Sequence, residues 1–145
     1  MDSEYRPRRT CLSVPASSER FLAKARELAA DEVMLDLEDS VASAAKDTAR
    51  ALAVGALKAG GWDGRLVAVR INGASTPWAY KDVIAVVEGA PGAVDSLVLP
   101  KVASSAAVRF PLRTAAASAA VSGASTLSAV SVSAWYVLAG GMRSL

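Results

Sequence analysis

The sequence contains no histidine and only one cysteine, Cys11. Without histidine, the chain cannot form a Ser-His-Asp triad, a Cys-His pair, a histidine-ligated zinc site or a histidine general base. A single cysteine cannot form an internal disulfide, and cysteine-poor chains are typical of reducing compartments. No apolar stretch follows the arginines near the first residue, so the sequence predicts no secretory signal. We therefore expect a cytoplasmic protein.

Acidic residues are missing from the last third of the chain. All 14 lie at or before Asp95, so residues 96–145 carry only four basic residues and no acidic one. Residues 1–95 hold 12 Lys/Arg against 14 Asp/Glu, a net charge of −2, and the overall charge of +2 therefore comes from the tail. No basic stripe with interleaved aromatic residues occurs, which argues against nucleic acid as a partner.

An uncharged run extends from Thr114 to Met142. Its length would suit a transmembrane helix, but eight of its 29 residues are serine or threonine. This composition makes a membrane helix unfavourable, so we expect no membrane association and keep a membrane-tethered fragment as a minor alternative. The acid-free, Ala/Ser-rich composition begins abruptly near Arg109. It favours a shifted reading frame or a disordered tail over native sequence of the preceding domain.

Before this tail, apolar and amphipathic segments alternate regularly. Apolar runs predict four strands, at Thr10–Val14, Glu32–Leu37, Arg65–Ile71 and Ser96–Val102. Three helices are predicted between them, at Glu19–Ala29 after the N-cap Ser18, at Ser43–Ala59 before Gly60, and from Pro77 to Gly89. The first helix should bury a face formed by Phe21, Leu22, Ala25 and Leu28. Strands that alternate with helices indicate βαβ units and a parallel sheet.

A barrel and a Rossmann fold both satisfy this alternation. A Rossmann fold requires G-x-G-x-x-G after the first strand, and the sequence has Pro15-Ala16-Ser17-Ser18 there. We therefore predict an α/β fold that is the N-terminal half of a TIM-type (β/α)8 barrel, truncated and followed by a dissimilar C-terminal tail. The expected organisation is an N-terminal arm over residues 1–9, a partial barrel over residues 10–108 and the tail over residues 109–145.

Polar side chains fall at the ends of two neighbouring predicted strands. Alternation in EVMLDLED places Asp36 and Glu38 toward the barrel interior, with Asp39 on the following loop. The same alternation in RLVAVRIN turns Arg70 and Asn72 inward. Barrel enzymes keep their active sites at the carboxyl ends of the strands. We therefore take these residues as the candidate site.

Their chemistry fits an acid substrate and a hard cation. Three nearby carboxylates suit Mg²⁺, and the planar fork of an arginine suits a substrate carboxylate. Structural roles stay open, because Asp39 or Ser40 can cap the next helix. Arg70 can also form a satisfied buried ion pair with Asp36.

Other candidates have less support. The turn Pro15–Ser18 leads into a helix N-terminus that can hold a phosphate, although serine-rich helix starts are commonly caps. Lys101 follows the fourth strand and can reach a ligand. Cys11 is expected to be a small core residue. Three aromatic residues should pack between the helices and the sheet: Trp62, Trp78 and Tyr80.

Four segments together resemble the citrate lyase β-subunit-like branch of the HpcH/HpaI aldolase family. They are RRTCLSVPASSERFLAKA, DEVMLDLEDSVASAAKDTAR, VAVRINGASTPWAYKD and DSLVLPKV, in the family's order and spacing. The resemblance covers about residues 8–108, roughly the first third of a full-length member. It implies a Mg²⁺-dependent TIM-barrel lyase that cleaves or forms carbon–carbon bonds in acyl-CoA thioesters of small hydroxy diacids. Citramalyl-CoA, malyl-CoA and citryl-CoA are examples of such thioesters.

The resemblance also implies roles for single residues. Arg70 matches the family's substrate-binding arginine, and Glu38 and Asp39 match acidic residues near the metal and its waters, which makes them candidate acid-base groups. The residues expected near CoA are Pro15, Ser17 and Lys101. Ala16 stands where the family usually has glycine, and a left-handed backbone there would cost alanine about 1 kcal/mol.

The resemblance implies no direct metal ligand in this chain. The family's ligands are a glutamate in a strand after the PKV strand and a later aspartate, and no acidic residue follows Asp95. One hypothesis is a lyase that is active when a complete chain or a complementary partner supplies the second half. The other is a catalytically inactive, truncated product. The expected partners are a small acyl-CoA or keto-acid substrate and, as in the family, further copies of the chain.

Overall fold

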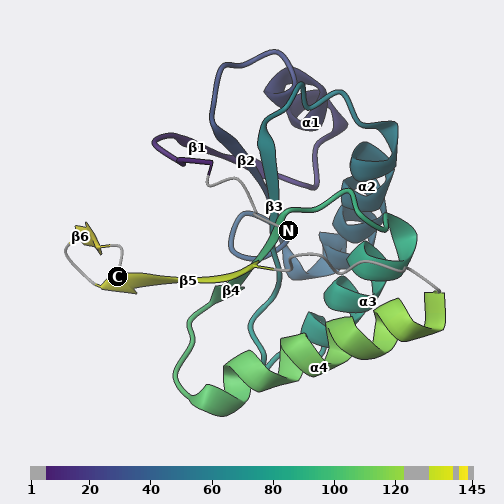
Figure 1. Cartoon of the computed structure of the whole chain (residues 1–145), viewed down its shortest axis with the longest axis vertical. Helices are drawn as coiled ribbons and strands as arrows, with labels where there is room; N and C mark the ends of the chain where they lie inside the picture. Colours follow the sequence, from purple (N-terminus) through teal and green to yellow (C-terminus); the bar gives the residue numbers. More distant parts are fainter. Residues whose placement is uncertain (1–5, 123–130, 139–140, 144–145) are drawn as a thin grey trace.

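The computed structural model describes residues 6–122, 131–138 and 141–143. Its sheet has the strand order β1-β2-β3-β4-β5-β6 (Figure 1). The strands are β1 (Cys11–Pro15), β2 (Glu32–Asp36), β3 (Leu66–Arg70), β4 (Ser96–Pro100), β5 (Ser131–Leu138) and β6 (Gly141–Arg143). The first five pair in parallel and β6 pairs antiparallel with β5.

Helical segments separate the first five strands. They are α1 (Glu19–Ala25), the 3₁₀ turn η1 (Ser43–Ala45), α2 (Lys46–Ala59), α3 (Ala79–Gly89) and α4 (Ser105–Ser122). Strands β1 to β5 therefore neighbour one another in chain order, and α2, α3 and α4 lie along one face of the sheet (Figure 1). This is the order of a β/α barrel, since a Rossmann sheet reverses direction and carries helices on both faces. The predicted α/β class with a parallel sheet is confirmed.

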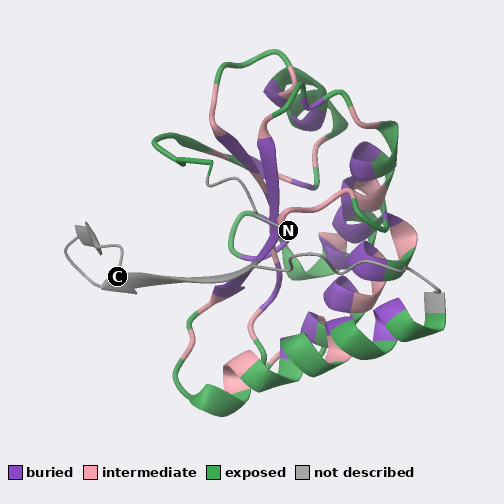
Figure 2. Cartoon of the chain, in the orientation of Figure 1, coloured by how far each residue is buried: buried purple, intermediate pink, exposed green. Residues whose placement is uncertain are grey.

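The core lies between the sheet and these helices (Figure 2). Alternate residues of β2, β3 and β4 form its sheet side: Val33, Leu35, Val67, Val69, Leu97 and Leu99, each at most 3% exposed. The period of two in the sequence thus identified the helix-facing side of β2 and of β3. The other set of alternate residues, which includes Asp36 and Arg70, belongs to the opposite face of the sheet.

The first helix differs from its prediction. Ser18 is its N-cap, because the Ser18 hydroxyl accepts a hydrogen bond from the backbone N–H of Phe21. Leu22 and Ala25 are buried, but Phe21 is 51% and Leu28 42% exposed. The helix ends at Ala25, so Leu28 no longer continues its apolar face. The helix α1 packs against the edge strand β1 and against α2, so few elements are available to cover its face.

Two further packing predictions are wrong. Cys11 is exposed rather than part of the core, because β1 is the edge strand of the sheet. Tyr80 is 44% exposed, since it lies outside the buried face of α3, to which Ala79 and Val83 belong. Trp62 is buried as expected.

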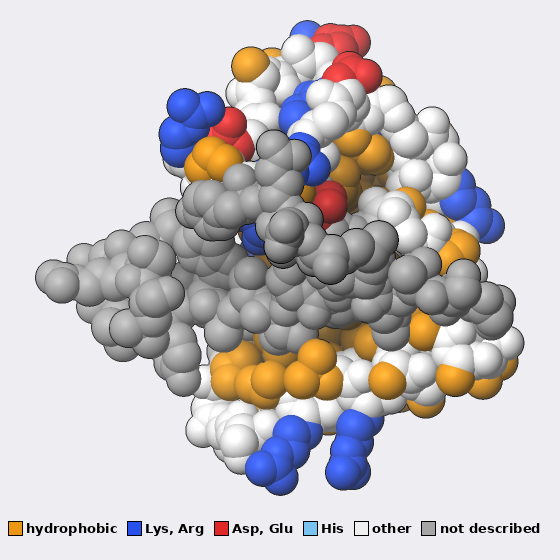
Figure 3. Space-filling model, viewed as in Figure 1, with side chains coloured by type: hydrophobic (Ala, Val, Ile, Leu, Met, Phe, Trp, Pro, Cys, Tyr) orange, Lys and Arg blue, Asp and Glu red, His pale blue; other side chains and the backbone are white. Residues whose placement is uncertain are grey.

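The helix α4 was not predicted from the sequence. It crosses residue 109 and contains Pro111, which removes one backbone donor from the helix. Ala115 and Ala119 are buried, whereas Phe110 and Leu112 are 37% and 42% exposed. Figure 3 shows hydrophobic and basic side chains together along the rim where α4 lies.

Among the described helices, none combines the length and the apolar composition needed to cross a bilayer. The uncharged run from Thr114 to Met142 lies partly outside the described residues, at 123–130 and 139–140.

Candidate active site

The carboxyl ends of β2 and β3 bring an aspartate and an arginine together. Asp36 and Arg70 are register partners on the two neighbouring parallel strands. Arg70 donates from Nε to Asp36 Oδ1 at 2.8 Å and from Nη2 to Asp36 Oδ2 at 2.7 Å. The pair is therefore bidentate, the strongest common geometry for an arginine and a carboxylate.

Asp36 is fully buried and further held by the loop that follows β2. It accepts hydrogen bonds from the backbone N–H groups of Glu38 and Ser40 and from the Ser40 hydroxyl. Burial alone would raise the pKa of Asp36, but the hydrogen bonds from Arg70, Ser40 and Glu38 outweigh it and lower that pKa to about 2. Asp36 is thus a permanently charged anchor for Arg70 at neutral pH.

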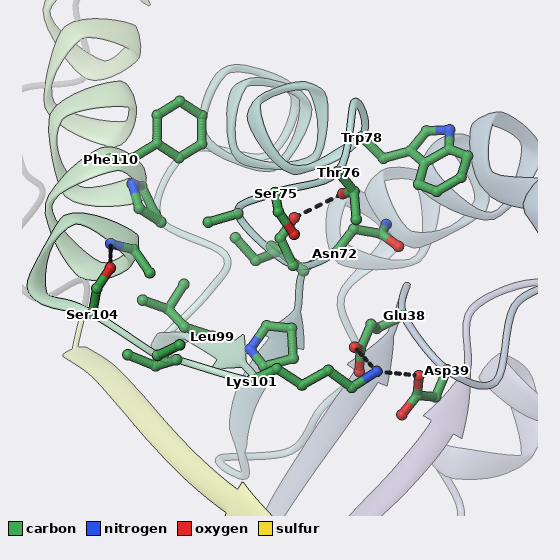
Figure 4. A pocket seen from close by; sticks show the side chains of 18 of the residues that line it. Glu38, Asp39, Asn72, Ser75, Thr76, Trp78, Leu99, Lys101, Ser104 and Phe110 are labelled. Carbon is green, nitrogen blue, oxygen red and sulfur yellow. Dashed lines mark hydrogen bonds and ion pairs between the residues drawn. The ribbon is translucent and has the colours of Figure 1, made fainter.

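A second charged group lies beside this pair. The Nζ of Lys101 is 2.9 Å from Glu38 Oε1 and 2.9 Å from Asp39 Oδ1 (Figure 4). The hydrogen bonds to Glu38 and Asp39 raise the pKa of Lys101. The other oxygen of Glu38, Oε2, lies 3.7 Å from Arg70 Nη1. This contact links the two groups into one charged cluster.

A cavity of about 790 Å³ opens next to Lys101. The loops after β2, β3 and β4 and the first turns of α4 form its wall (Figure 4). Its lining includes Glu38, Asn72, Ser75, Lys101 and Phe110. The wall thus combines charged, amide, hydroxyl and aromatic side chains, as ligand sites commonly do. Arg70 is not among the residues that line this cavity.

A buried polar network supports the wall. Asp82 of α3 accepts hydrogen bonds from the backbone N–H and the Nδ2 of Asn72, at 2.9 and 2.6 Å, and from Arg50 Nε at 2.8 Å. Lys46 donates to the backbone carbonyls of Leu37 and Glu38 at 2.8 and 2.6 Å. These contacts fix the loops after β2 and β3.

Sequence reasoning missed the three charged residues of this network. Lys46 and Arg50 stand four residues apart on α2 and are 6% and 9% exposed, and Asp82 is 0% exposed beside the buried Val83. Charged residues on the apolar face of an amphipathic helix are rarely buried without a partner. The occurrence of charged residues at helix positions that face the core was the signal from which this network could have been predicted.

The structure brings some predicted site residues together and leaves others apart. Glu38, Asp39 and Lys101 meet at one point, and Arg70 contacts them through Glu38. Pro15 and Ser17 do not line the described cavity, and Ser17 is exposed. The roles assigned to all of these residues stay predictions.

The alanine that replaces the family's glycine carries no left-handed backbone. Among the described non-glycine residues, only Asp63 and Lys101 have a positive φ. Ala16 is fully buried, and its N–H donates to the backbone carbonyl of Asp36 at 3.0 Å. The predicted alanine penalty therefore does not arise at this turn.

The described residues do not fit a directly bound Mg²⁺. No group of three His, Cys, Asp or Glu side chains in the described part of the chain is arranged to hold a metal ion. At the candidate site, Glu38 and Asp39 both contact the Lys101 ammonium, and Asp36 is occupied by Arg70 and Ser40. We therefore assign no step to a metal within this chain.

Comparisons with solved structures support the barrel. CitE of Mycobacterium tuberculosis, solved with magnesium and acetoacetate, has a TM-score of 0.61 and 30% identity, with 90% of this chain and 45% of that chain covered. Malate synthase of Haloferax volcanii, solved as a lead(II) complex, has a TM-score of 0.78 and 17% identity, with 90% and 41% covered. The second likeness concerns the fold alone. The predicted partial TIM-type barrel is confirmed.

Comparisons of sequence agree with the motifs. The L-malyl-CoA/β-methylmalyl-CoA lyase of Cereibacter sphaeroides is 41% identical over 103 residues, which cover 71% of this chain and 32% of the lyase. The (3S)-malyl-CoA thioesterase of the same species is 40% identical over 106 residues, or 73% of this chain and 36% of the thioesterase. This chain thus spans about a third of the length of these relatives. Residues 9–120 match the HpcH/HpaI aldolase/citrate lyase family, and the chain belongs to that family.

Proposed function

We propose that this chain provides the N-terminal half of the active site of a carbon–carbon lyase that acts on acyl-CoA thioesters of small hydroxy diacids. The lyase and thioesterase relatives both act, by their names, on malyl-CoA, which is a thioester of this class. The observation that carries the proposal is the Arg70 guanidinium at the carboxyl end of β3, anchored by buried Asp36.

Arg70 would bind the free carboxylate of the substrate. Its Nε and Nη2 each donate one N–H to Asp36, so Nη1 and the second N–H of Nη2 are left to face a ligand. Glu38 Oε2 lies 3.7 Å from Nη1. A guanidinium that a buried carboxylate already orients loses little freedom when it binds a second carboxylate. This preorganisation is the contribution of Asp36 to the proposed site.

The proposed reaction breaks the bond between the hydroxyl-bearing carbon and the carbon next to the thioester. The hydroxyl loses its proton and becomes the carbonyl of a keto acid, and the electron pair of the broken bond forms the thioester enolate. A proton then adds to the enolate carbon and gives the shorter acyl-CoA. Glu38 and Asp39 are the acid-base candidates among the described residues, and Lys101 is a candidate to contact the anionic part of CoA.

A second candidate is a chain without catalytic activity of its own, and we favour it for the 145 residues taken alone. The supporting observation is that Glu38 and Asp39 both contact Lys101, while no acidic residue follows Asp95. A complementary polypeptide would then have to supply the remaining acid groups and any direct Mg²⁺ ligands. Both candidates use the same Arg70 site.

A chimera separates the two candidates. Residues 9–120 would replace the aligned segment of the C. sphaeroides malyl-CoA lyase, and cleavage of malyl-CoA would be followed by chromatography of the acyl-CoA products. We expect turnover by the chimera with magnesium and none by the 145-residue chain. In the chimera, Arg70→Ala should lower kcat/KM about 100-fold because a charge-assisted contact to the substrate is lost.

The control is Arg70→Lys in the same chimera, which keeps the charge and loses the planar fork. A folded chimera that cleaves malyl-CoA equally well without Arg70 would overturn the role proposed for this residue. Turnover by the purified 145-residue chain would overturn the inactive alternative.

A further inference from the structure

We infer that Lys101 is the resident cation of the Glu38–Asp39 pair and keeps divalent cations off these two carboxylates. The inference concerns ion binding by the chain itself and holds whether or not the chain belongs to a working lyase. The described carboxylates do not fit a directly bound magnesium, because Lys101 contacts both Glu38 and Asp39.

The ammonium occupies the position that an ion would take. Lys101 Nζ lies 2.9 Å from one oxygen of Glu38 and 2.9 Å from one oxygen of Asp39, so it bridges the two side chains (Figure 4). A magnesium or calcium ion bound by both carboxylates would need oxygen atoms at about 2.0–2.6 Å. To bind through Glu38 Oε1 and Asp39 Oδ1, it would have to displace Nζ from these two oxygens.

The backbone directs Lys101 to this position. Lys101 has a φ of +52°, in the left-handed region that non-glycine residues seldom adopt. It directly follows β4, whereas the two carboxylates follow β2, so the side chain spans the end of the intervening strand β3. A left-handed lysine at a strand end, bonded to two acids, indicates that these contacts are part of the folded structure.

A second ammonium, that of Lys46, contacts the main-chain carbonyl oxygen of Glu38. Lys46 Nζ donates to the carbonyl of Glu38 at 2.6 Å and to the carbonyl of Leu37 at 2.8 Å. One carboxylate oxygen, Oε1, and the main-chain carbonyl oxygen of Glu38 therefore already contact a lysine. Two positive charges beside the pair also repel an approaching divalent cation.

Glu38 is the residue that most requires a cation. Its side chain is only 8% exposed, and its Oε2 has no hydrogen-bond donor among the described residues. A buried carboxylate without a nearby positive charge is unfavourable. Removal of the Lys101 ammonium would leave Arg70 Nη1, 3.7 Å away, as the remaining described ion-pair partner of Glu38, so the carboxylate pair should attract another cation.

The test is a titration of the full 145-residue chain with Mn²⁺, an ion that takes the same oxygen ligands as magnesium. The loss of the free Mn²⁺ signal in electron paramagnetic resonance reports binding. We expect no saturable binding by the unaltered chain in the millimolar range. Lys101→Met should bind Mn²⁺ at least about tenfold more tightly, since one competing positive charge is gone.

Matched variants make the result specific. Lys58→Met removes one positive charge from the exposed end of α2 and should leave Mn²⁺ binding unchanged. Lys101→Arg keeps a cation at the site and should behave like the unaltered chain. The double variant Lys101→Met/Glu38→Gln should lose the binding gained by Lys101→Met, and circular dichroism would verify the fold of each variant.

Two outcomes would overturn the inference. One is tight Mn²⁺ binding by the unaltered chain that Lys101→Met does not strengthen, because the lysine would then not compete. The other is a folded Lys101→Met chain that gains no more Mn²⁺ affinity than Lys58→Met.

Discussion

At the scale of single residues, the Asp36–Arg70 pair links the candidate site to folding. Asp36 is fully buried, and the side chain of Arg70 is 23% exposed. Each side chain satisfies the charge of the other, so a change at either position affects both the binding surface and the free energy of unfolding. The pair thus has the structural role that the sequence left open for Arg70, and the role of Arg70 in substrate binding is our proposal.

Replacement of Asp36 by asparagine should destabilise the chain. The substitution keeps the shape of the side chain but leaves Arg70 without its charged partner, which we expect to lower the free energy of unfolding by about 3 kcal/mol. Urea denaturation measures the change. Asp63→Asn, at a side chain that is 83% exposed, is the control and should change stability by less than about 1 kcal/mol. Equal effects of the two substitutions would contradict the anchoring role.

The same aspartate predicts a pH dependence of stability. Its pKa is lowered from the ordinary 3.8 to about 2 in the folded chain, so its stabilising effect is present above about pH 4 and is lost as the pH falls from about 4 to about 2. The loss should be about 2 kcal/mol. Asp31 also has a pKa lowered to about 2, so the difference between the unaltered chain and Asp36→Asn isolates Asp36. A difference that stays constant from pH 5 to about pH 2 would contradict this assignment.

Part of the site could be predicted from single residues and part could not. Alternation along β2 and β3 placed Asp36 and Arg70 on the same face, and parallel neighbours then bring them together. The contacts of Lys101 with Glu38 and Asp39 depend on the left-handed backbone of Lys101 at the end of a third strand. No pattern in a single sequence predicts that backbone conformation for a lysine. The Asn72–Asp82 bond likewise joins a loop to a helix that follows it.

At the scale of elements, two arginines join the ends of the first two helices. Arg65, at the start of β3, donates to the backbone carbonyls of Ala25, Arg26 and Leu28 after α1. Arg26 in turn donates to the carbonyls of Ala56 and Gly60 at the end of α2 and lies 4.7 Å from the ring centre of Trp62. The unpaired carbonyls at both helix ends are thus satisfied by side chains from neighbouring elements.

Loss of Arg65 should loosen α1. Arg65→Ala removes the donor from these three carbonyls and from those of Gly61 and Trp62, and we expect a loss of about 2 kcal/mol in the free energy of unfolding. Hydrogen exchange should report faster opening of α1 than of α3. Arg20→Ala, at an exposed arginine within α1, removes the same charge and serves as the control. The stabilising role of the Arg65 hydrogen bonds would be disproved if both variants had the same stability as the unaltered chain.

The elements themselves were predicted with unequal success. Strands β2, β3 and β4 followed from apolar runs because their helix-facing residues are buried in the core. The face of α1 was wrong because the helix is short and borders the edge strand. The helix α4 gave little signal, since its alanine-rich sequence contains a proline and has few large apolar residues to mark a buried face.

At the scale of the whole molecule, the described sheet has an open edge at β1. Backbone bonds from Ala16 N–H to the carbonyl of Asp36 and from Glu32 N–H to the carbonyl of Thr10 show that even-numbered residues of this segment pair with β2. Cys11, Ser13 and Pro15 therefore direct their backbone groups to the free edge. Such edges favour pairing with another chain, and Pro15 already lacks one donor there.

Ser13→Pro should reduce self-association of the chain. It removes an outward donor and leaves the bonds to β2 intact, because proline is tolerated at edge positions of this kind. Sedimentation velocity over a range of concentrations would measure the change, with Ser13→Thr as the control. Identical association of the two variants, with the fold verified by circular dichroism, would show that the β1 edge does not mediate contacts between copies.

The chain-order arrangement of β1 to β5 has a consequence during synthesis. Each of these strands after the first pairs with the strand that left the ribosome immediately before it, across a connection that includes one helix. A nascent chain can therefore add one β/α unit at a time to an existing sheet edge, and no strand has to wait for a partner made much later. Rare codons between units would then delay the next addition without exposing an unpaired interior strand.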